Sequence, residues 1–327
     1  MKAPSCLVLA AAAGALLLTS SRVSACPCSD DGGTSSLVRD DERYAAALVA
    51  TSRHALGHFD AFGQYHALGP ADGEASEELL LRAGLRLPRR VEWLGELGYA
   101  SYRFHTMSRV EAHTGVGDAL LRARWTVRDE GMPHESPWLP SLSLASLLRA
   151  PLGALADNRS AGFGSGGAQL GLGAWELGAG FDATRSLVPE LQLMLGAEGA
   201  YRFEDHVLGR ARRLGPRLDA TVGARLMPSA WLAATFALRA RFTADVALSN
   251  GDGNGLQRLP GTAERLWSLV VGAAVYDRNS KLRSSLTLSW DPPVGSFSVG
   301  TTAAAALSVA LAYGVPAPND AAALNTR

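Results

Sequence analysis

The stretch Leu191-Gln-Leu-Met-Leu-Gly-Ala-Glu-Gly-Ala-Tyr-Arg202 alternates between two kinds of residue along its whole length. One set of alternate positions is almost entirely apolar and ends on Tyr201. The other set carries Gln192, Glu198 and Arg202. A period of two is the period of an extended strand, whose side chains point to opposite faces in turn. This stretch therefore predicts a β-strand with one apolar face and one polar face.

The same alternation recurs along most of the chain, with clear copies at 79–87, 119–128 and 282–291. Between Ala119 and Arg128 the split places Leu121, Trp125 and Val127 on the face opposite to the arginines. Twelve candidate strands follow from this pattern. They span residues 43–57, 77–87, 90–104, 116–128, 140–151, 172–185, 190–203, 215–227, 230–243, 264–277, 281–290 and 298–314.

The connections between these strands are sorted by length. Tight turns fall at residues 88, 186–189, 228–229 and 277–280. Long polar segments fall at 58–76, 105–115, 152–171, 204–214 and 244–263, and a medium loop at 129–139 breaks the alternation. A secreted β-sandwich also has alternating strands, but nothing in it sorts loops in this way. An outer-membrane barrel does, because short turns face the periplasm and long loops face the exterior. The sequence thus predicts an all-β chain that forms a transmembrane antiparallel β-barrel of twelve strands.

The N-terminus has the features of an export signal. Lys2 precedes an apolar run from Leu7 to Leu18, which is too short to span a membrane, and Val23-Ser24-Ala25 is a small-residue cleavage site. The expected organisation has four parts, each defined by composition and strand rhythm. They are a cleaved export signal at 1–25, a flexible N-terminal segment with Cys26-Pro-Cys28 at 26–42, the outer-membrane β-barrel at 43–315, and a C-terminal tail at 316–327.

Aromatic residues gather near both ends of the candidate strands, as interfacial girdles do. The group near the short-turn end consists of Trp93, Trp125, Tyr276 and Tyr313. The group near the long-loop end consists of Phe104, Trp175, Tyr201, Phe203, Phe242, Trp267 and Trp290. The aromatic positions therefore support an assignment in which the outward face meets outer-membrane lipid.

The polar face of the strands should point into the barrel and line its lumen. The pore-lining candidates are the charged residues of that face: Arg82, Arg86, Glu92, Glu96, Arg122, Arg124, Arg128, Glu176, Glu198, Arg202, Arg239, Arg241 and Arg283. One interpretation is a salt-bridged plug, because buried charges are tolerated when they are paired. The other is a narrow water-filled pore in which the excess of arginine favours anions. The second interpretation expects some of these guanidinium groups to be unpaired.

Two strands resemble a known group of proteins. The motif Gly115, Gly117, Asp118 opens one strand, and Gly173, Trp175, Glu176, Gly178, Gly180 opens another. With the Cys26-Pro-Cys28 start, these segments resemble bacterial outer-membrane barrels described as transporters or as "MetA-pathway of phenol degradation"-like proteins. The resemblance implies an outer-membrane barrel for uptake or export of a small molecule. The tail after Tyr313 departs from the aromatic ending that most barrels carry.

The sequence gives no sign of catalysis, of a cofactor or of nucleic-acid binding. Ser249-Asn250-Gly251 matches part of a barrel hydrolase motif, but the position two before the serine is Ala247, so the histidine base is missing. Net charge is zero and the isoelectric point is near neutral, which does not favour a nucleic-acid partner. The expected function is a channel or transporter for small, anionic solutes. The alternative is a plugged structural or interaction barrel that acts through its long outer loops or a lipidated N-terminus.

Cysteine and histidine offer two further hypotheses. Val23-Ser24-Ala25-Cys26 fits a lipobox, which makes Cys26 a candidate for lipidation, and it equally fits ordinary cleavage after Ala25. Cys26 and Cys28 alone are an incomplete metal site, so no metal site is assigned. A minor alternative is a metal-related uptake barrel with imidazoles at its outer rim. The histidines in or next to the predicted outer loops are His54, His58, His66, His105, His113 and His206.

The barrel prediction can be tested on the expressed protein. A strand in lipid must pair all of its backbone polar groups, so the folded chain should be a closed, compact object. We expect it to fractionate with outer membranes and to migrate faster on a gel when the sample is not heated. A protein recovered from the periplasm without detergent would contradict the prediction.

Overall fold

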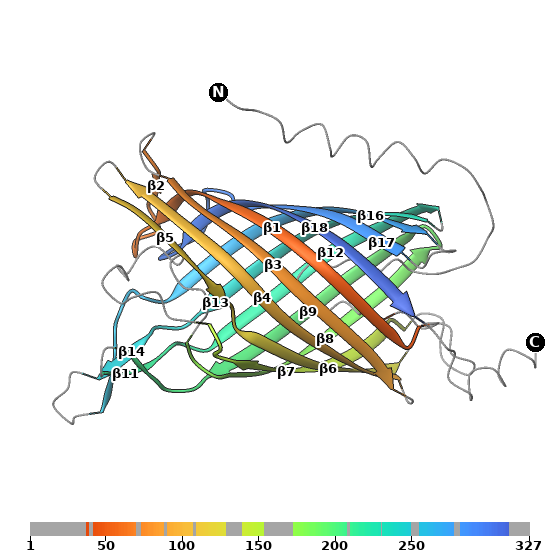
Figure 1. Cartoon of the computed structure of the whole chain (residues 1–327), viewed down its shortest axis with the longest axis horizontal. Helices are drawn as coiled ribbons and strands as arrows, with labels where there is room; N and C mark the ends of the chain where they lie inside the picture. The colour runs from red at the N-terminus through yellow and green to blue at the C-terminus, as the bar shows by residue number, and fades with distance from the viewer. Residues whose placement is uncertain are drawn as a thin grey trace, which may run out of the picture.

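The computed structural model describes residues 37–38, 42–69, 73–87, 90–106, 109–128, 139–153, 173–207, 210–229, 231–249, 255–277 and 282–313. Twelve strands make a closed wall (Figure 1). They are β1 (Tyr44–Phe59), β3 (Gly73–Leu87), β4 (Val91–Thr106), β6 (Ala119–Arg128), β7 (Ser141–Ala150), β8 (Glu176–Val188), β9 (Leu191–Arg202), β12 (Arg217–Ser229), β13 (Leu232–Thr243), β16 (Glu264–Asp277), β17 (Leu282–Trp290) and β18 (Gly300–Tyr313).

Each wall strand pairs with its neighbours in the wall in antiparallel fashion, and the first strand also pairs with the last. The β1–β18 register runs from Tyr44 opposite Tyr313 to His58 opposite Gly300, with one irregularity between Ala55 and Gly57. This pairing closes the sheet and removes its free edges. The predicted fold class, an all-β antiparallel barrel of twelve strands, is confirmed. Among the described residues, no helix is long and apolar enough to cross a membrane.

The two ends of the barrel differ as the loop lengths predict. One end, the short-turn end, has connections such as residues 189–190 between β8 and β9. The other end, the loop end, carries additional short strands (Figure 1). These are β2 (Tyr65–Ala67), β5 (Arg109–Val116), β10 (Asp205–Val207), β11 (Arg210–Arg213), β14 (Ala247–Ser249) and β15 (Leu256–Arg258), of which β10, β11, β14 and β15 form a small sheet of their own.

One predicted loop is wrong. The segment 105–115 was expected to be long and irregular, but β4 continues to Thr106 and β5 pairs with it from Thr106 opposite Arg109 to Tyr99 opposite Val116. Only residues 107–108 separate the two strands. The charged and His-rich composition of this segment resembles that of a loop, yet an extended hairpin satisfies its backbone equally well.

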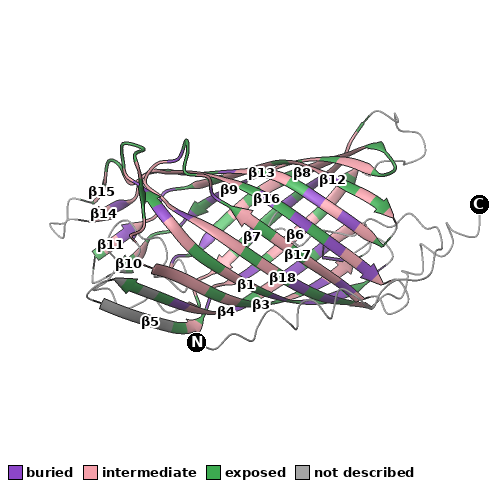
Figure 2. Ribbon diagram, turned by 90° about the horizontal axis from the view of Figure 1, so that it is seen from above, coloured by how far each residue is buried: buried purple, intermediate pink, exposed green. Residues whose placement is uncertain are grey.

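The two faces of the wall strands are sorted by polarity. Outward residues such as Leu79, Leu81, Leu193 and Leu195 are exposed, whereas Glu198 and its inward neighbours are largely buried. Figure 2 shows the resulting alternation of exposed and buried positions along the strands. In a water-soluble protein such an apolar surface would be unfavourable, so this surface is suited to a lipid environment.

Among the aromatic residues whose side chains the structure describes, the girdles are present with one exception. Trp93 and Trp125 are exposed near the short-turn end, and Trp175 and Trp290 are exposed near the loop end. Tyr276 was predicted to join the short-turn girdle, but its side chain is only 4% exposed. Its strand position has the parity of Val270 and Ala274, which are also buried, so Tyr276 points inward.

The segment before the barrel contributes residues to its interior. Of the predicted flexible segment 26–42, the structure describes Leu37, Val38 and Glu42, and all three are buried. Leu37 and Val38 pack with Ala45 of β1 and Leu94 of β4. The export signal at 1–25, Cys26 with Cys28, and the tail at 316–327 lie outside the described residues.

The facing of β9 leads to a matched pair of substitutions. Leu195 is half-exposed on the outward face, and Met194 lies on the opposite face of the same strand. A charge on the lipid face costs about 2–4 kcal/mol at the bilayer midplane. We expect Leu195→Arg to reduce the amount of heat-modifiable barrel more than Met194→Arg does. Equal loss from the two variants would contradict this facing.

Candidate functional site

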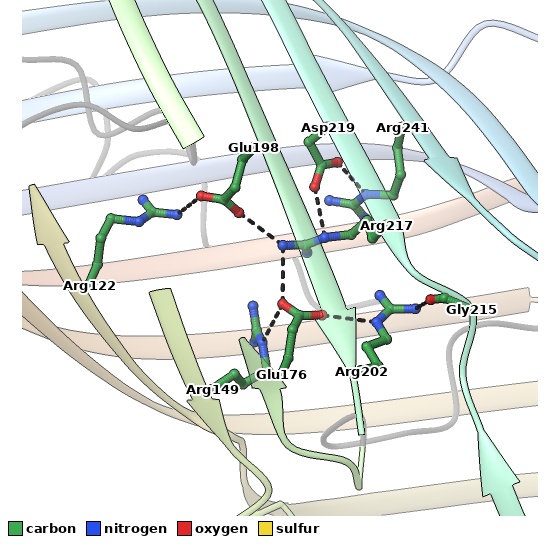
Figure 3. A network of polar contacts seen from close by, with 9 residues as sticks. All are labelled: Arg122, Arg149, Glu176, Glu198, Arg202, Gly215, Arg217, Asp219 and Arg241. Atoms are coloured by element: carbon green, nitrogen blue, oxygen red, sulfur yellow. Dashed lines mark hydrogen bonds and ion pairs between the residues drawn. The ribbon is translucent and has the colours of Figure 1, made fainter. Parts of the chain in front are cut away.

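Charged side chains from six neighbouring wall strands meet on the inner face of the barrel, near its loop end (Figure 3). Strands β6, β7, β8, β9, β12 and β13 each contribute. Their inward positions are charged because the alternating pattern places arginine and glutamate opposite to the lipid-facing leucines. We call this group the inner charge network, and it consists of Arg122, Arg149, Glu176, Glu198, Arg202, Arg217, Asp219 and Arg241.

Glu176 is the most deeply placed member of the network. Its side chain is fully buried, and three guanidinium groups surround its carboxylate. The nearest N···O distances are 2.9 Å to Arg202, 3.1 Å to Arg217 and 3.6 Å to Arg149. Arg202 also donates to the backbone carbonyl of Gly215, at 3.5 Å. Charge-assisted hydrogen bonds of this kind hold the side chains of several strands in fixed positions.

Glu198 links strands that are not neighbours in the wall. Its carboxylate accepts a hydrogen bond from Arg122 on β6 at 2.7 Å and one from Arg217 on β12 at 3.0 Å. Between β6 and β9 lie two strands, β7 and β8. Because the wall is curved, inward side chains can reach over the intervening strands, and the network therefore lies on the inner surface rather than within one strand pair.

Arg217 and Asp219 continue the network to β13. The Arg217 guanidinium lies 2.9 Å from the Asp219 carboxylate, and the Arg241 guanidinium lies 2.7 Å from the same carboxylate. Arg241 differs from the other members because 49% of its side chain is exposed, against 9% for Arg217. Arg241 is therefore the member most accessible to a solute that enters from the loop end.

The network has an excess of positive charge. It contains five arginines and three carboxylates, so its formal charge is 5 − 3 = +2. The Glu264 carboxylate on β16 interacts electrostatically with Arg202 and Arg241 and reduces the local excess to +1. A further pair nearby, Arg124 with Asp182 at 3.4 Å, is balanced. In a space with low-dielectric walls, a small excess of fixed charge focuses the field along the axis and raises the local concentration of counter-ions. The arrangement can therefore attract anions and repel cations.

The glycines of the second resemblance motif make room for these side chains. A β-carbon on Gly180 would lie 2.6 Å from the Ala197 carbonyl oxygen and 3.1 Å from Cβ of Glu198. Any larger residue would push β8 away from β9 and displace the Glu198 carboxylate. The motif from Gly173 to Gly180 therefore has a local physical role: it places Glu176 inside the barrel, and Gly180 leaves space for the Glu198 side chain.

Apart from Arg128, the remaining predicted pore-lining residues also lie on the inner face, but outside the network. An irregularity between Thr126 and Arg128 pairs Arg128 with Leu142, which has the parity of the exposed Leu144. Arg82 and Glu96 pair across β3 and β4 at 3.5 Å. Glu92 and Arg283 lie at the short-turn end, where they contact the N-terminal segment. Arg86, Arg128 and Arg239 are half-buried, and each has an interaction partner.

The arginines of β6 and β13 do not provide the unpaired guanidinium groups that the pore interpretation expects. Arg122, Arg124 and Arg241 each have a carboxylate partner, and Arg128 and Arg239 have interactions of their own. Strand β6, which carries Arg122, Arg124 and Arg128, contains no acidic residue. The structure supplies Asp182 and Glu198 from β8 and β9, which the curvature of the wall brings within reach.

Three network members, Arg149, Arg217 and Asp219, were not among the pore-lining candidates. Arg217 and Arg149 lie on the inward faces of β12 and β7. The alternation of faces along each strand identifies both residues. Arg217 has the parity of Asp219, and Arg149 has the parity of the buried Ala145 and Leu147. Alternation alone would therefore have found both.

The histidines do not form a metal centre in the part of the chain that the structure describes. His58 stacks on His66 with ring centroids 5.2 Å apart, and His66 Nε2 lies 3.3 Å from a carboxylate oxygen of Asp60. The pKa of Asp60 is lowered, chiefly because the Gln64 backbone N–H donates to it. No group of three or more His, Cys, Asp or Glu side chains with metal-binding geometry occurs among those residues.

The fold is similar to that of outer-membrane barrels of known structure. The COG4313 outer membrane channel from Pseudomonas putida F1 aligns with a TM-score of 0.65 at 14% identity, covering 83% of this chain and 96% of that chain. The NanC porin aligns at 0.44 and 7% identity, covering 81% and 98%, and the transport unit of the autotransporter AIDA-I from Escherichia coli aligns at 0.45 and 8%, covering 83% and 90%. No protein-family model and no curated protein sequence matches this chain.

The first of these likenesses defines the class of the protein by fold. At 14% identity the first shows the shared architecture, a closed outer-membrane β-barrel, and the TM-scores of the other two are too low to carry an argument. The chain is therefore an outer-membrane β-barrel in fold.

Removal of the Glu176 carboxylate should weaken the barrel. In Glu176→Leu, Arg149, Arg202 and Arg217 lose a shared counter-charge and repel one another. Breaking a buried ion pair costs about 3–5 kcal/mol, so we expect the gel-shift transition to move to clearly lower temperature. The matched control is Glu204→Leu, at an exposed position two residues beyond β9. An equal effect of the two variants would contradict a structural role for the network.

Proposed function

We propose that this barrel is an outer-membrane channel or transporter for small anionic solutes. The observation that carries the proposal is the inner charge network, which has two more guanidinium groups than carboxylates and leaves Arg241 half exposed. Rings of fixed charge set the selectivity of narrow pores. An anion that enters the lumen can reach Arg241, the most exposed guanidinium group of the network.

The proposed location follows from the same features as the fold. The exposed leucines and the two aromatic girdles fit a bilayer with Trp93 and Trp175 at opposite interfaces. We place the short-turn end in the periplasm and the loop end outside the cell. Export by the signal at 1–25, with cleavage after Ala25, would deliver the chain to that membrane. Outer-membrane lipid is then the main partner, and the small solute is the second.

We also propose that the chain belongs to the group of "MetA-pathway of phenol degradation"-like barrels that it resembles. Its support is that both motif segments have defined roles here: Glu176 and Gly180 build the network, and Asp118 accepts a hydrogen bond from the Gly153 backbone at 3.2 Å. Membership of that group would favour uptake or export of a small molecule.

A second candidate function is favoured by the pairing of charges. Glu176 is completely enclosed by arginines, and the ion pairs of the inner charge network join β6, β7, β8, β9, β12 and β13. A barrel with such a cross-linked interior can serve as a plugged structural element that interacts through its outer loops. Absence of any conductance would support this candidate against the channel.

We propose no catalytic role. Ser249 and Ala247 belong to the short strand β14, and residue 247 supplies no base for the serine. We also propose that Cys26 is lipidated. The support for this proposal is the lipobox-like segment at 23–26.

The anion preference can be measured in planar bilayers. We expect the purified protein to pass chloride more readily than potassium, as shown by the reversal potential in a salt gradient. Arg239→Glu combined with Arg241→Glu reverses the local charge and should reduce or invert that preference while the heat-modifiable barrel remains. The control is Arg258→Glu, on β15 outside the barrel wall. A cation preference in the unaltered protein would refute the electrostatic argument.

A further inference from the structure

Aromatic side chains enclose one arginine on the outer face of the wall, at the loop end. Arg265 is the second residue of β16 and has the outward parity of Leu269 and Val271, which are both exposed. In the ladder it lies directly opposite Phe242 of β13. On its other side it forms an isolated antiparallel bridge with Phe297. Residues directly opposite one another share a face of the sheet, so all three side chains lie outside the barrel.

The rings hold the Arg265 guanidinium group in place. Its Cζ atom lies over the Phe297 ring, 5.0 Å from the centroid, where the negative face of the ring attracts a cation. Phe242 meets Trp267 edge-to-face, with the ring centroids 6.1 Å apart. The Trp267 indole N–H donates to the Gly295 carbonyl at 3.2 Å, and this bond holds the segment that carries Phe297 against the outside of β16. The arginine therefore belongs to an ordered surface.

Arg265 has no carboxylate partner in the part of the chain that the structure describes. No hydrogen bond or ion pair joins its guanidinium group to another residue of that part, and its Nε atom is buried without an acceptor there. The inward arginines are different, since Arg202 and Arg217 each bind a carboxylate. A guanidinium group that is fixed at a surface without a counter-charge favours an anionic group from outside the chain.

The place of Arg265 along β16 corresponds to one edge of the lipid-facing band. The other edge lies near Val275, because the next residue donates its backbone N–H to Trp231, an exposed tryptophan at the short-turn end. Val275 and Arg265 are ten positions apart on β16. At about 3.3 Å per residue and a tilt of about 40°, the strand rises about 25 Å over this length, which is the height of the apolar band of such barrels. Arg265 therefore lies at the level of lipid head groups.

Between Arg265 and the middle of the band, the outer face is apolar and exposed. Leu269 lies opposite Leu238 of β13 on one side and opposite Trp290 of β17 on the other. These three side chains are 43%, 37% and 44% exposed, in that order. A molecule that fits this surface has an anionic head at the level of Arg265 and hydrocarbon chains below it. A phosphorylated lipid has both parts, and a guanidinium group binds phosphate through two parallel N–H···O bonds.

We propose that Arg265 and Phe297 form a binding site for a phosphate group of lipid A, the phosphorylated glycolipid of the outer leaflet. The acyl chains of this lipid lie along Leu238, Leu269 and Trp290. The site is on the outside of the wall, so it is independent of passage through the lumen. It rests on the orientation proposed above, in which the loop end faces the exterior, because lipid A occupies the outer leaflet. The bound lipid supplies the counter-charge for Arg265.

The first test measures, by native mass spectrometry, how much lipid A stays with the barrel after purification in dodecyl maltoside. We expect the unaltered protein to retain lipid A and Arg265→Gln to reduce the retained fraction several-fold. Arg265→Lys keeps the charge but not the paired N–H groups, so it should give an intermediate value. The matched control is Arg43→Gln, because Arg43 also lies over an aromatic ring, 5.5 Å from the Tyr44 centroid, but at the short-turn end. The control should retain as much lipid A as the unaltered protein, and gel migration without heating checks that every variant is folded.

The second test adds lipid back to protein that has been stripped of it. A ligand that binds the folded state stabilises it, so lipid A should raise the temperature of the gel-shift transition of the unaltered protein more than that of Arg265→Gln. Lipid A from which the phosphate groups have been removed should raise it much less. Phosphatidylglycerol should also have a smaller effect, because its phosphodiester carries one negative charge, whereas a phosphate monoester carries nearly two.

Equal retention of lipid A by the unaltered protein and by Arg265→Gln would overturn the proposal, and so would equal stabilisation by lipid A with and without its phosphate groups. Equal stabilisation by phosphatidylglycerol would refute the assignment to lipid A. Loss of lipid A from Arg43→Gln with full retention by Arg265→Gln would overturn the site together with the proposed orientation of the barrel. The anion preference in planar bilayers is a separate measurement, so failure of the lipid site and failure of the proposed channel function are distinguishable.

Discussion

Every feature of this molecule depends on closure of the sheet by the ladder between β1 and β18. A strand that crosses lipid has no water to satisfy its backbone, so a free edge would leave a row of unpaired N–H and C=O groups. The ladder pairs residues 44–58 with residues 300–313, the two ends of the barrel domain. Closure in turn creates an inside, and all polar side chains of the wall must be accommodated there.

The inward-facing charges of the wall are accommodated by pairing with one another. Charges that face inward have to find partners, because an isolated buried charge is strongly unfavourable. Carboxylates such as Glu176 and Glu198 each bind two or more arginines. Sharing of carboxylates is what leaves the network with an excess of positive charge, and this excess is the basis of the proposed preference for anions.

The two ends of the lumen are built differently. Near the loop end the inner surface is charged and cross-linked by side chains of the wall itself. Near the short-turn end it is covered by Leu37 and Val38, which come from outside the wall and are held through their backbone. The two ends of the lumen therefore present different surfaces to a solute.

The sequence by itself determined the twelve strands, their order and their facing, because a period of two and the sorting of loop lengths are local properties of the chain. It also placed the inward charges, and it contained the parity signal for Arg149 and Arg217. Only the tertiary structure decided which charges meet, since the curvature of the wall brings β6 to β9 and β8 to β12. It alone decided the hairpin of β4 and β5 and the burial of Leu37 and Val38, because these depend on contacts between segments far apart in the chain that no local pattern encodes.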